Sequence, residues 1–271
     1  IESSPSGSPY KGSSGWIDSG VISRFNAVTI NPAISRSSDT SGSDTLVTTC
    51  SINLHRINGA RHASRVILRT GGRLLEESAG EGWDGALDGL VGLLKRIRPR
   101  GGLRAVLSQH FSRVLLLPPP PIRLAAAEMD GWVAASLAER YGAEAAGWRG
   151  IWQDVPPGRP VPVAVAEAGR LDELLRRCGE AGSRVARIEP WFVAAWNRHH
   201  GHLARKSGWF ALLEPGRAAL ARIESGLPLA MRIGHTSAAP LDDLAALVAR
   251  ERLNTTDVTG ELWLATAGVA V

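Results

Sequence analysis

The 271-residue sequence has only two cysteines, and it lacks any apolar run of the roughly 18 residues that a membrane-spanning helix needs. Cys50 and Cys178 lie in unrelated surroundings, which favours a reducing compartment without structural disulfides. The opening segment also lacks the charged and then apolar layout of a signal peptide. We therefore expect a soluble protein.

Lysine is scarce, with only three residues, and a strong charge imbalance is missing. The sequence holds 31 basic and 26 acidic residues, a net charge of +5, and nearly all of the basic residues are arginine. A nucleic-acid interface would gather basic residues and aromatics on one face, whereas here the arginines are scattered along the chain. Nucleic acid is therefore disfavoured as a partner.

A length of 271 residues suits one large domain or two of ordinary size, and a hydrophobic content of 44% predicts a globular protein with a real core. Residues 1–62 differ from the rest, because they are rich in Ser, Gly and Thr and show no periodic apolar face. Such a composition predicts a disordered or poorly packed head. The segment from Gly12 to Gly15 lacks the lysine ending and the preceding strand of a phosphate loop.

Regular structure is expected from Ala63 onward. Gly71 and Gly72 lie between two strand-like runs, which is typical of a tight hairpin. Apolar residues at helical spacing then predict a helix over 83–97, ended by Pro99 and the glycines after it. Further along, the sequence predicts strands over 103–107 and 111–117 and a helix over 122–141.

The clearest local signals lie between Pro160 and Arg198. Valines alternate with small residues over 161–165, which predicts a buried strand, and a helix starts near Leu171. A second strand around 185–188 and a helix after Pro190 complete the segment. The order strand, helix, strand, helix favours a right-handed parallel unit.

A second meander opens at Gly208. Three strand-like runs over 209–213, 218–223 and 227–233 are separated by good turn sequences, and a helix over 241–253 and a strand over 261–266 follow. Two parts of the chain thus each begin with a meander and continue into alternating elements. This is a repeat of structure without a repeat of sequence.

One stretch resembles a known family. The segment from Gln109 to Pro118, with Glu128, Tyr141 and the runs VPVAVAE, LDELLRRCGEAG and RVARIEPWFVAAWNR, is similar to the actin-like type IV pilus assembly protein PilM and to the cytoplasmic domain of the type II secretion L protein. The similar portion covers about residues 64–271.

The resemblance implies an α/β fold of two RNase-H-like, actin/hexokinase-type subdomains with a small inserted subdomain. On this basis residues 63–207 form the first half, with the insert at about 111–155. Residues 208–271 form a second, truncated half.

Actin-like ATPases hold phosphates at an Asp-Gly-rich turn in the opening hairpin of each half. The expected turns here are Thr70-Gly71-Gly72-Arg73 and Glu214-Pro215-Gly216-Arg217, and Pro215 removes one backbone donor. We therefore expect Gly71, Gly72 and Gly216 to mark vestigial phosphate turns, with ATP and Mg²⁺ disfavoured as cofactors.

The resemblance then implies a non-catalytic scaffold at the cytoplasmic face of a bacterial inner membrane. Such a scaffold binds a short segment of a membrane-anchored pilus or secretion component. An actin-like ATPase or small-molecule kinase that uses Mg-ATP stays open as the alternative, and a hydrolase on a different α/β fold is a third reading.

Other polar clusters favour structural readings. Zinc needs three or four ligands in tetrahedral directions, and His199, His200 and His202 are more typical of a solvated helix end. Ser108 lies beside His110 but lacks the framing glycines of a hydrolase nucleophile. No metal site is predicted. The adjacent acidic pairs at 76–77 and 242–243 are expected to be surface charges.

Nine tryptophans are many for this length. Tryptophan at helical spacing more often belongs to a core, because each ring buries a large area. Trp148 and Trp152 are the exceptions, since they are expected in a loop-like connection beside the insert. They are our candidates for contact with a peptide of a partner.

Overall fold

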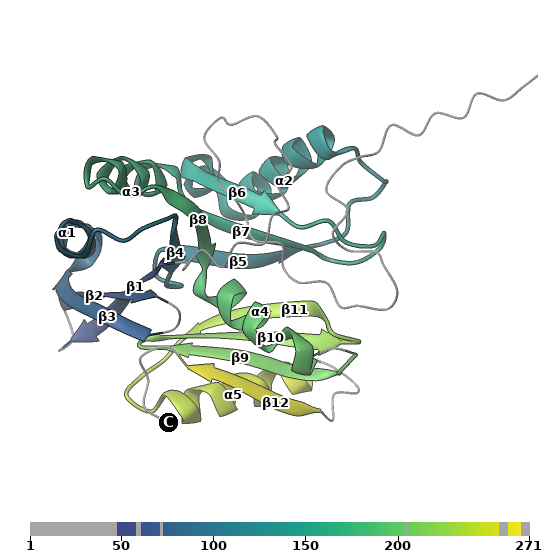
Figure 1. Ribbon diagram of the computed structural model, residues 1–271. Helices are drawn as coiled ribbons and strands as arrows, with labels where there is room; N and C mark the ends of the chain where they lie inside the picture. Colours follow the sequence, from purple (N-terminus) through teal and green to yellow (C-terminus); the bar gives the residue numbers. More distant parts are fainter. Residues whose placement is uncertain (1–47, 58–60, 71–72, 204, 255–259, 267–271) are drawn as a thin grey trace, which may run out of the picture.

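Three β-sheets and their covering helices make up the structure, a computed structural model that describes residues 48–57, 61–70, 73–203, 205–254 and 260–266 (Figure 1). Two of the sheets repeat one strand order, and the third is formed by a segment that precedes the last strand of the first sheet in the chain. Among the described residues, no helix is both long enough and apolar enough to cross a lipid bilayer.

The first sheet has five strands in the order β3-β2-β1-β4-β8. The first three pair antiparallel as a meander, whereas β4 pairs parallel with both β1 and β8. Helix α1 connects the meander to β4 and packs on one face of the sheet. The bounds are β1 Thr48–Ile57, β2 Arg61–Thr70, β3 Arg73–Glu81, α1 Gly82–Ile97, β4 Leu103–Leu107 and β8 Val185–Pro190.

Strand β1 corrects the sequence prediction for the head. Residues 1–62 were expected to be poorly packed, but 48–57 form the central strand of the first sheet, with β2 on one side and β4 on the other. Cys50 and Ile52 are fully buried there. The strand is missed because only a few of its residues are apolar, and its partners lie elsewhere in the chain. Residues 1–47 lie outside the described residues.

The third sheet belongs to an insert between β4 and α3. Its strands pair antiparallel in the order β5-β7-β6, and α2 packs on it with Met129, Val133 and Leu137. Helix α2 begins at Ala126, four residues later than the predicted start at 122. At this start the Glu128 carboxylate accepts the Ala125 N–H at 2.6 Å. The bounds are β5 Ser112–Leu117, α2 Ala126–Tyr141, the 3₁₀ helix η1 Gly142–Gly147, β6 Trp148–Trp152 and β7 Val161–Glu167.

Strand β7 overturns the predicted parallel unit. The alternating valines do form a strand, but it pairs antiparallel with β5 and β6, and it is not a neighbour of β8. Helix α3 (Ala168–Glu180) then leads to β8, which joins the first sheet beside β4. The order of elements was right and the pairing wrong, because pairing depends on the distant strand β5. The insert, predicted to end at about residue 155, therefore continues to residue 167, where β7 ends.

The second sheet repeats the first with four strands, in the order β11-β10-β9-β12. Strand β9 is buried along its whole length, because a helix covers each of its faces. Phe210 packs with Trp196 of α4, while Trp209 packs with Leu244 of α5. The bounds are α4 Trp191–Leu203, β9 Gly208–Glu214, β10 Arg217–Glu224, β11 Leu227–His235, α5 Pro240–Leu253 and β12 Glu261–Thr266.

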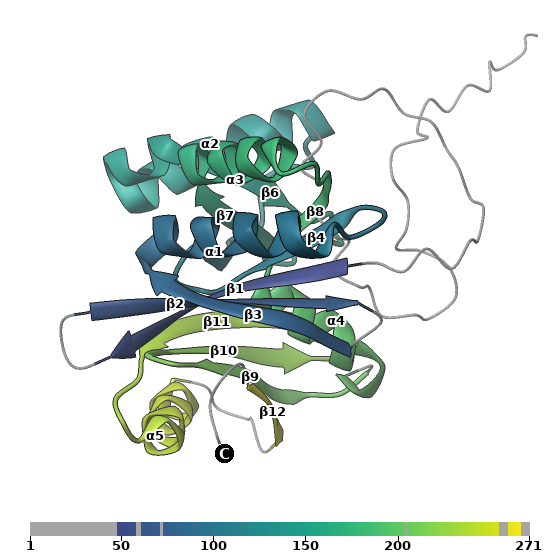
Figure 2. The same cartoon turned by 60° about the vertical axis from the view of Figure 1, so that its left-hand side comes forward.

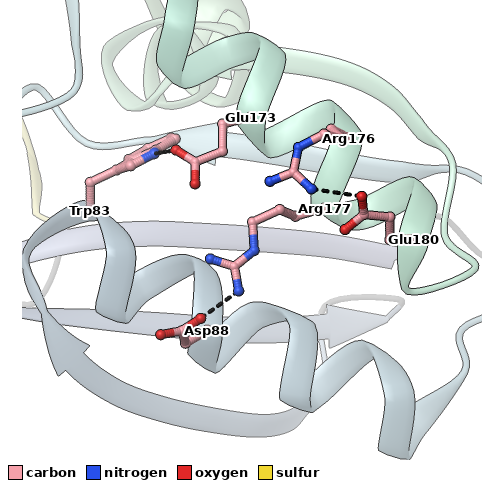
Figure 3. A network of polar contacts seen from close by, with 6 residues as sticks. All are labelled: Trp83, Asp88, Glu173, Arg176, Arg177 and Glu180. Atoms are coloured by element: carbon pink, nitrogen blue, oxygen red, sulfur yellow. Dashed lines mark hydrogen bonds and ion pairs between the residues drawn. The ribbon is translucent and has the colours of Figure 1, made fainter.

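Helices α1 and α3 lie side by side above the first sheet (Figure 2). Polar contacts join them at the surface, where the Trp83 indole donates to Glu173 at 3.1 Å and Arg177 pairs with Asp88 (Figure 3). Exposed ion pairs of this kind contribute little stability. Leu171, Leu174 and Cys178 of α3 are buried in the same core as α1, and burial of such apolar area stabilises the pair of helices more.

Candidate functional site

The two halves meet where β4 ends in the first and β9 ends in the second. After Leu107 the chain turns through Ser108, Gln109 and His110 before β5 begins. Strand β9 ends at Glu214, and a tight turn leads to β10. This junction lies at the second predicted phosphate turn, so it is the first place to look for a nucleotide site.

Glu214 is held inside the junction by groups from the other half. Only 1% of the residue is exposed, the Ser108 hydroxyl donates to its carboxylate, and the Gln109 backbone N–H donates at 3.1 Å. Burial raises the pKa of Glu214 to about 7, although the hydrogen bonds from Ser108 and Gln109 and the charge of Arg217 act to lower it. The carboxylate of this turn is therefore already hydrogen-bonded to other groups of the chain.

The turn after Glu214 is also tied to the first half. His110 Nε2 lies 3.0 Å from the Pro215 carbonyl, and because a carbonyl can only accept, Nε2 is the protonated nitrogen of this contact. Gly216 has a φ of 78°, a left-handed conformation that glycine adopts without strain. The Gly216 carbonyl accepts the Thr236 N–H at 3.1 Å. The turn is therefore braced by protein groups on two sides.

Ser108 has a structural position and not that of a nucleophile. The residue is fully buried, its hydroxyl donates to Glu214, and it accepts the His110 backbone N–H at 3.2 Å. The His110 ring is directed to Pro215 instead. A hydrolase would need the imidazole to accept the serine proton at an accessible position, and this arrangement does not provide it.

Gly71 and Gly72 do not occupy the turn that the sequence prediction gave them. Because β1 precedes β2, these glycines connect β2 and β3, which is the second turn of the meander. The counterpart of the Glu214 turn is the connection between β1 and β2, at residues 58–60. Both connections lie outside the described residues, so only Gly216 of the three predicted glycines has a described position.

The histidines lie near the end of α4. The His200 Nδ1 is 2.8 Å from the Asn197 carbonyl, within the same helix. Burial lowers the pKa of His199, with smaller contributions from Arg198 and His202. Among the described residues, no group of three or more His, Cys, Asp or Glu side chains could hold a metal ion.

Trp148 and Trp152 begin and end strand β6 instead of lying in a loop. Both are half-buried against the core of the insert. The Trp152 indole donates to Asp130 at 2.7 Å, and the Trp148 ring lies 5.1 Å from the Tyr141 ring with the Arg113 guanidinium 4.9 Å from its centroid. The loop expectation failed because a five-residue strand with a central glycine has a weak sequence signal.

The repeated strand order, the insert after β4 and the junction between the halves define an actin-like fold. Solved structures agree. The cytoplasmic domain of EpsL, an inner membrane component of the type II secretion system of Vibrio cholerae, matches with a TM-score of 0.53 and 12% identity, covering 81% of this chain and 82% of that chain. A Bacteroides thetaiotaomicron protein with an actin-like ATPase fold and unknown function matches with a TM-score of 0.50 and 10% identity, covering 85% and 86%.

A type IV pilus biogenesis complex of PilM and PilN is a further neighbour, with a TM-score of 0.47 and 18% identity, covering 76% of this chain and 66% of that chain. The resemblance predicted from sequence is thus confirmed as a likeness of fold. No family model and no curated protein sequence matches this chain.

Proposed function

We propose that this chain is a non-catalytic, actin-like scaffold of a pilus or type II secretion assembly platform, and that it binds a short segment of a membrane-anchored partner. The observation that carries the proposal is that the turn after β9 is already bonded to side-chain and backbone groups of the first half. In a phosphate turn, backbone N–H groups face the ligand. Here Pro215 has no N–H, and Glu214 is buried under Ser108 and Gln109.

The role on an assembly platform is supported by the EpsL domain, which is described as part of an inner membrane component of a secretion system. By analogy, this scaffold works in the cytoplasm at the inner face of the membrane. Trp148 and Trp152 are proposed contacts for the partner, because each ring is only half-buried and keeps part of its surface accessible.

Calorimetric titration with Mg-ATP tests the non-catalytic part of the proposal. No saturable heat is expected, because Pro215 removes one backbone donor from the turn and the Glu214 carboxylate is already hydrogen-bonded within the chain. Mg-ADP serves as the matched titrant, since it would reveal a site that excludes only the γ-phosphate. Saturable binding of either nucleotide would contradict the proposal and favour the ATPase or kinase alternative.

Capture of a partner tests the scaffold part. The immobilised full chain is expected to retain the cytoplasmic segment of a membrane-anchored pilus or secretion component made by the same cell. The same segment with its residues in scrambled order is the control. If none of these components is retained above its scrambled control, the scaffold role is wrong.

A further inference from the structure

A groove of about 490 Å³ lies at the surface between the insert and the second half. Strand β5 forms one wall and strand β11 the other, and the end of α2 and Arg217 complete it. Each of these strands is the last in its sheet, so each has one edge without a neighbouring strand in the described sheets. Two strand edges therefore border the same groove, and its volume is in the range of known ligand sites.

The lining of the groove is positively charged. It includes Arg113, Arg140, Arg217 and Arg232, and no aspartate or glutamate. Two of these arginines have carboxylate partners within the chain, with Arg113 2.9 Å from Glu144 and Arg232 3.0 Å from the carboxylate of residue 251. Arg140 makes a long contact of 3.5 Å with the Leu116 carbonyl of the β5 wall, and its guanidinium lies 5.8 Å from the centroid of the Tyr141 ring.

Arg217 differs from the other three. Its Nε is buried and has no hydrogen-bond partner among the described residues. Burial lowers the pKa of Arg217, the nearby charge of Arg113 lowers it further, and Glu214 offsets part of the effect. A buried donor without an acceptor is costly, and an anionic group in the groove would remove that cost.

We propose that this groove binds an extended, acidic peptide segment of the partner, which lies along the groove and pairs with the backbone at the partly exposed edge of β11. The inference rests on the proposed scaffold function and names the chemistry of the segment. Strand addition uses the unpaired backbone groups of a sheet edge for affinity, and pockets for alternate side chains for specificity. Carboxylates of the segment reach Arg217 and Arg140.

The apolar part of the lining fits the other side chains of such a segment. Leu115, Leu229 and Met231 line the groove together with the arginines. Alternate side chains of an extended peptide point to opposite sides, so acidic and apolar residues in alternation would meet arginines and these apolar residues in turn. A small phosphate-like anion would engage the arginines but would leave the strand edges unused.

Fluorescence anisotropy with a labelled peptide of about six residues, alternating Glu and Val, tests the proposal on the full chain. Saturable binding is expected, and it weakens as salt screens the charges. A peptide with Gln in place of Glu, and a Glu-Val peptide methylated at its backbone nitrogens, are both expected to bind much more weakly. Equal binding of the Gln peptide removes the charge argument, and equal binding of the methylated peptide removes strand pairing.

Variants locate the site. Arg217→Gln is expected to weaken binding of the Glu-Val peptide by about tenfold or more, because a charge-assisted bond at a buried position is lost. Arg140→Gln, at an exposed position, is expected to weaken it by about threefold. Arg217→Lys keeps the charge and restores part of the affinity. Arg176→Gln, which removes an arginine on α3 away from the groove, is the control and leaves binding unchanged.

Three outcomes overturn the inference. The first is that the Glu-Val peptide does not bind. The second is that Arg217→Gln binds it as well as the native chain does, while circular dichroism shows both proteins to be folded. The third is that the native chain self-associates in sedimentation and that Arg217→Gln abolishes this self-association. The last would assign the groove to a second copy of this chain. Capture of the membrane-anchored segment separates the two proposals: if Arg217→Gln captures it as well as the native chain does, the scaffold stands and the groove assignment falls.

Discussion

At the scale of the residue, the buried carboxylate of Glu214 has a strongly raised pKa. This carboxylate is buried between the two halves and its pKa is raised to about 7 from an ordinary 4.5, chiefly by burial. A raised pKa means that the folded state holds its proton more tightly than the unfolded state does. The associated stability is therefore present below about pH 4.5 and is lost as the pH rises to about 7.

Glu214→Gln is expected to remove this pH dependence. Glutamine stays neutral, and its amide oxygen can still accept from Ser108. As the pH rises from about 4.5 to 7, the native chain should therefore lose about 3 kcal/mol of its free energy of unfolding relative to the variant. Urea unfolding of both proteins at the two pH values measures the shift.

Glu224→Gln provides the control, because Glu224 ends β10 at an exposed position. The Glu224→Gln variant should show the same change in the free energy of unfolding between the two pH values as the native chain. A Glu214→Gln variant that follows the native chain in the same way would show that Glu214 titrates normally.

At the scale of the element, most helices and strands could be predicted from local signals, because amphipathic periodicity and turn residues act over short distances. Pairing could not, since the parallel unit expected for β7 and β8 depended on the location of β5. The same holds for the candidate site. The Glu214 turn and Ser108 were each visible in the sequence, but nothing in the sequence indicated that they pair across 106 positions.

Strand β1 provides the element-scale prediction. Ile52 is fully buried at the centre of the first sheet, so Ile52→Ala is expected to lower the free energy of unfolding by about 2–5 kcal/mol. Leu74→Ala on the edge strand β3 is the matched control, because Leu74 is 50% exposed and should lose much less. Denaturant unfolding of both variants decides, and an equal loss would argue that β1 does not belong to the core.

At the scale of the whole molecule, one core crosses the boundary between the halves. Trp196 of α4 and Val114 of β5 belong to the same cluster as Phe210 of β9, and the Trp196 and Phe210 rings meet edge to face at 5.4 Å. Neither half can lose this cluster without exposing apolar surface of the other. We therefore expect the two halves to unfold together.

Trp196→Ala tests this expectation. The variant should lose about 3–5 kcal/mol, because a large buried ring is removed, and its single transition should move to lower urea concentration. Unfolding is followed by far-ultraviolet circular dichroism and by the fluorescence of the remaining tryptophans. Coincident curves are expected in both proteins, whereas two separate transitions in the native chain would show that the halves are independent.

The place of β8 has a consequence for biosynthesis. The strand that completes the first sheet follows the entire insert and α3, although its neighbour β4 precedes both. A ribosome must therefore deliver the insert before the first half can close, and until then the open side of β4 is exposed to other chains in the cell. Cotranslational folding of this protein should consequently proceed through the insert, with the earlier sheet completed only after the insert has formed.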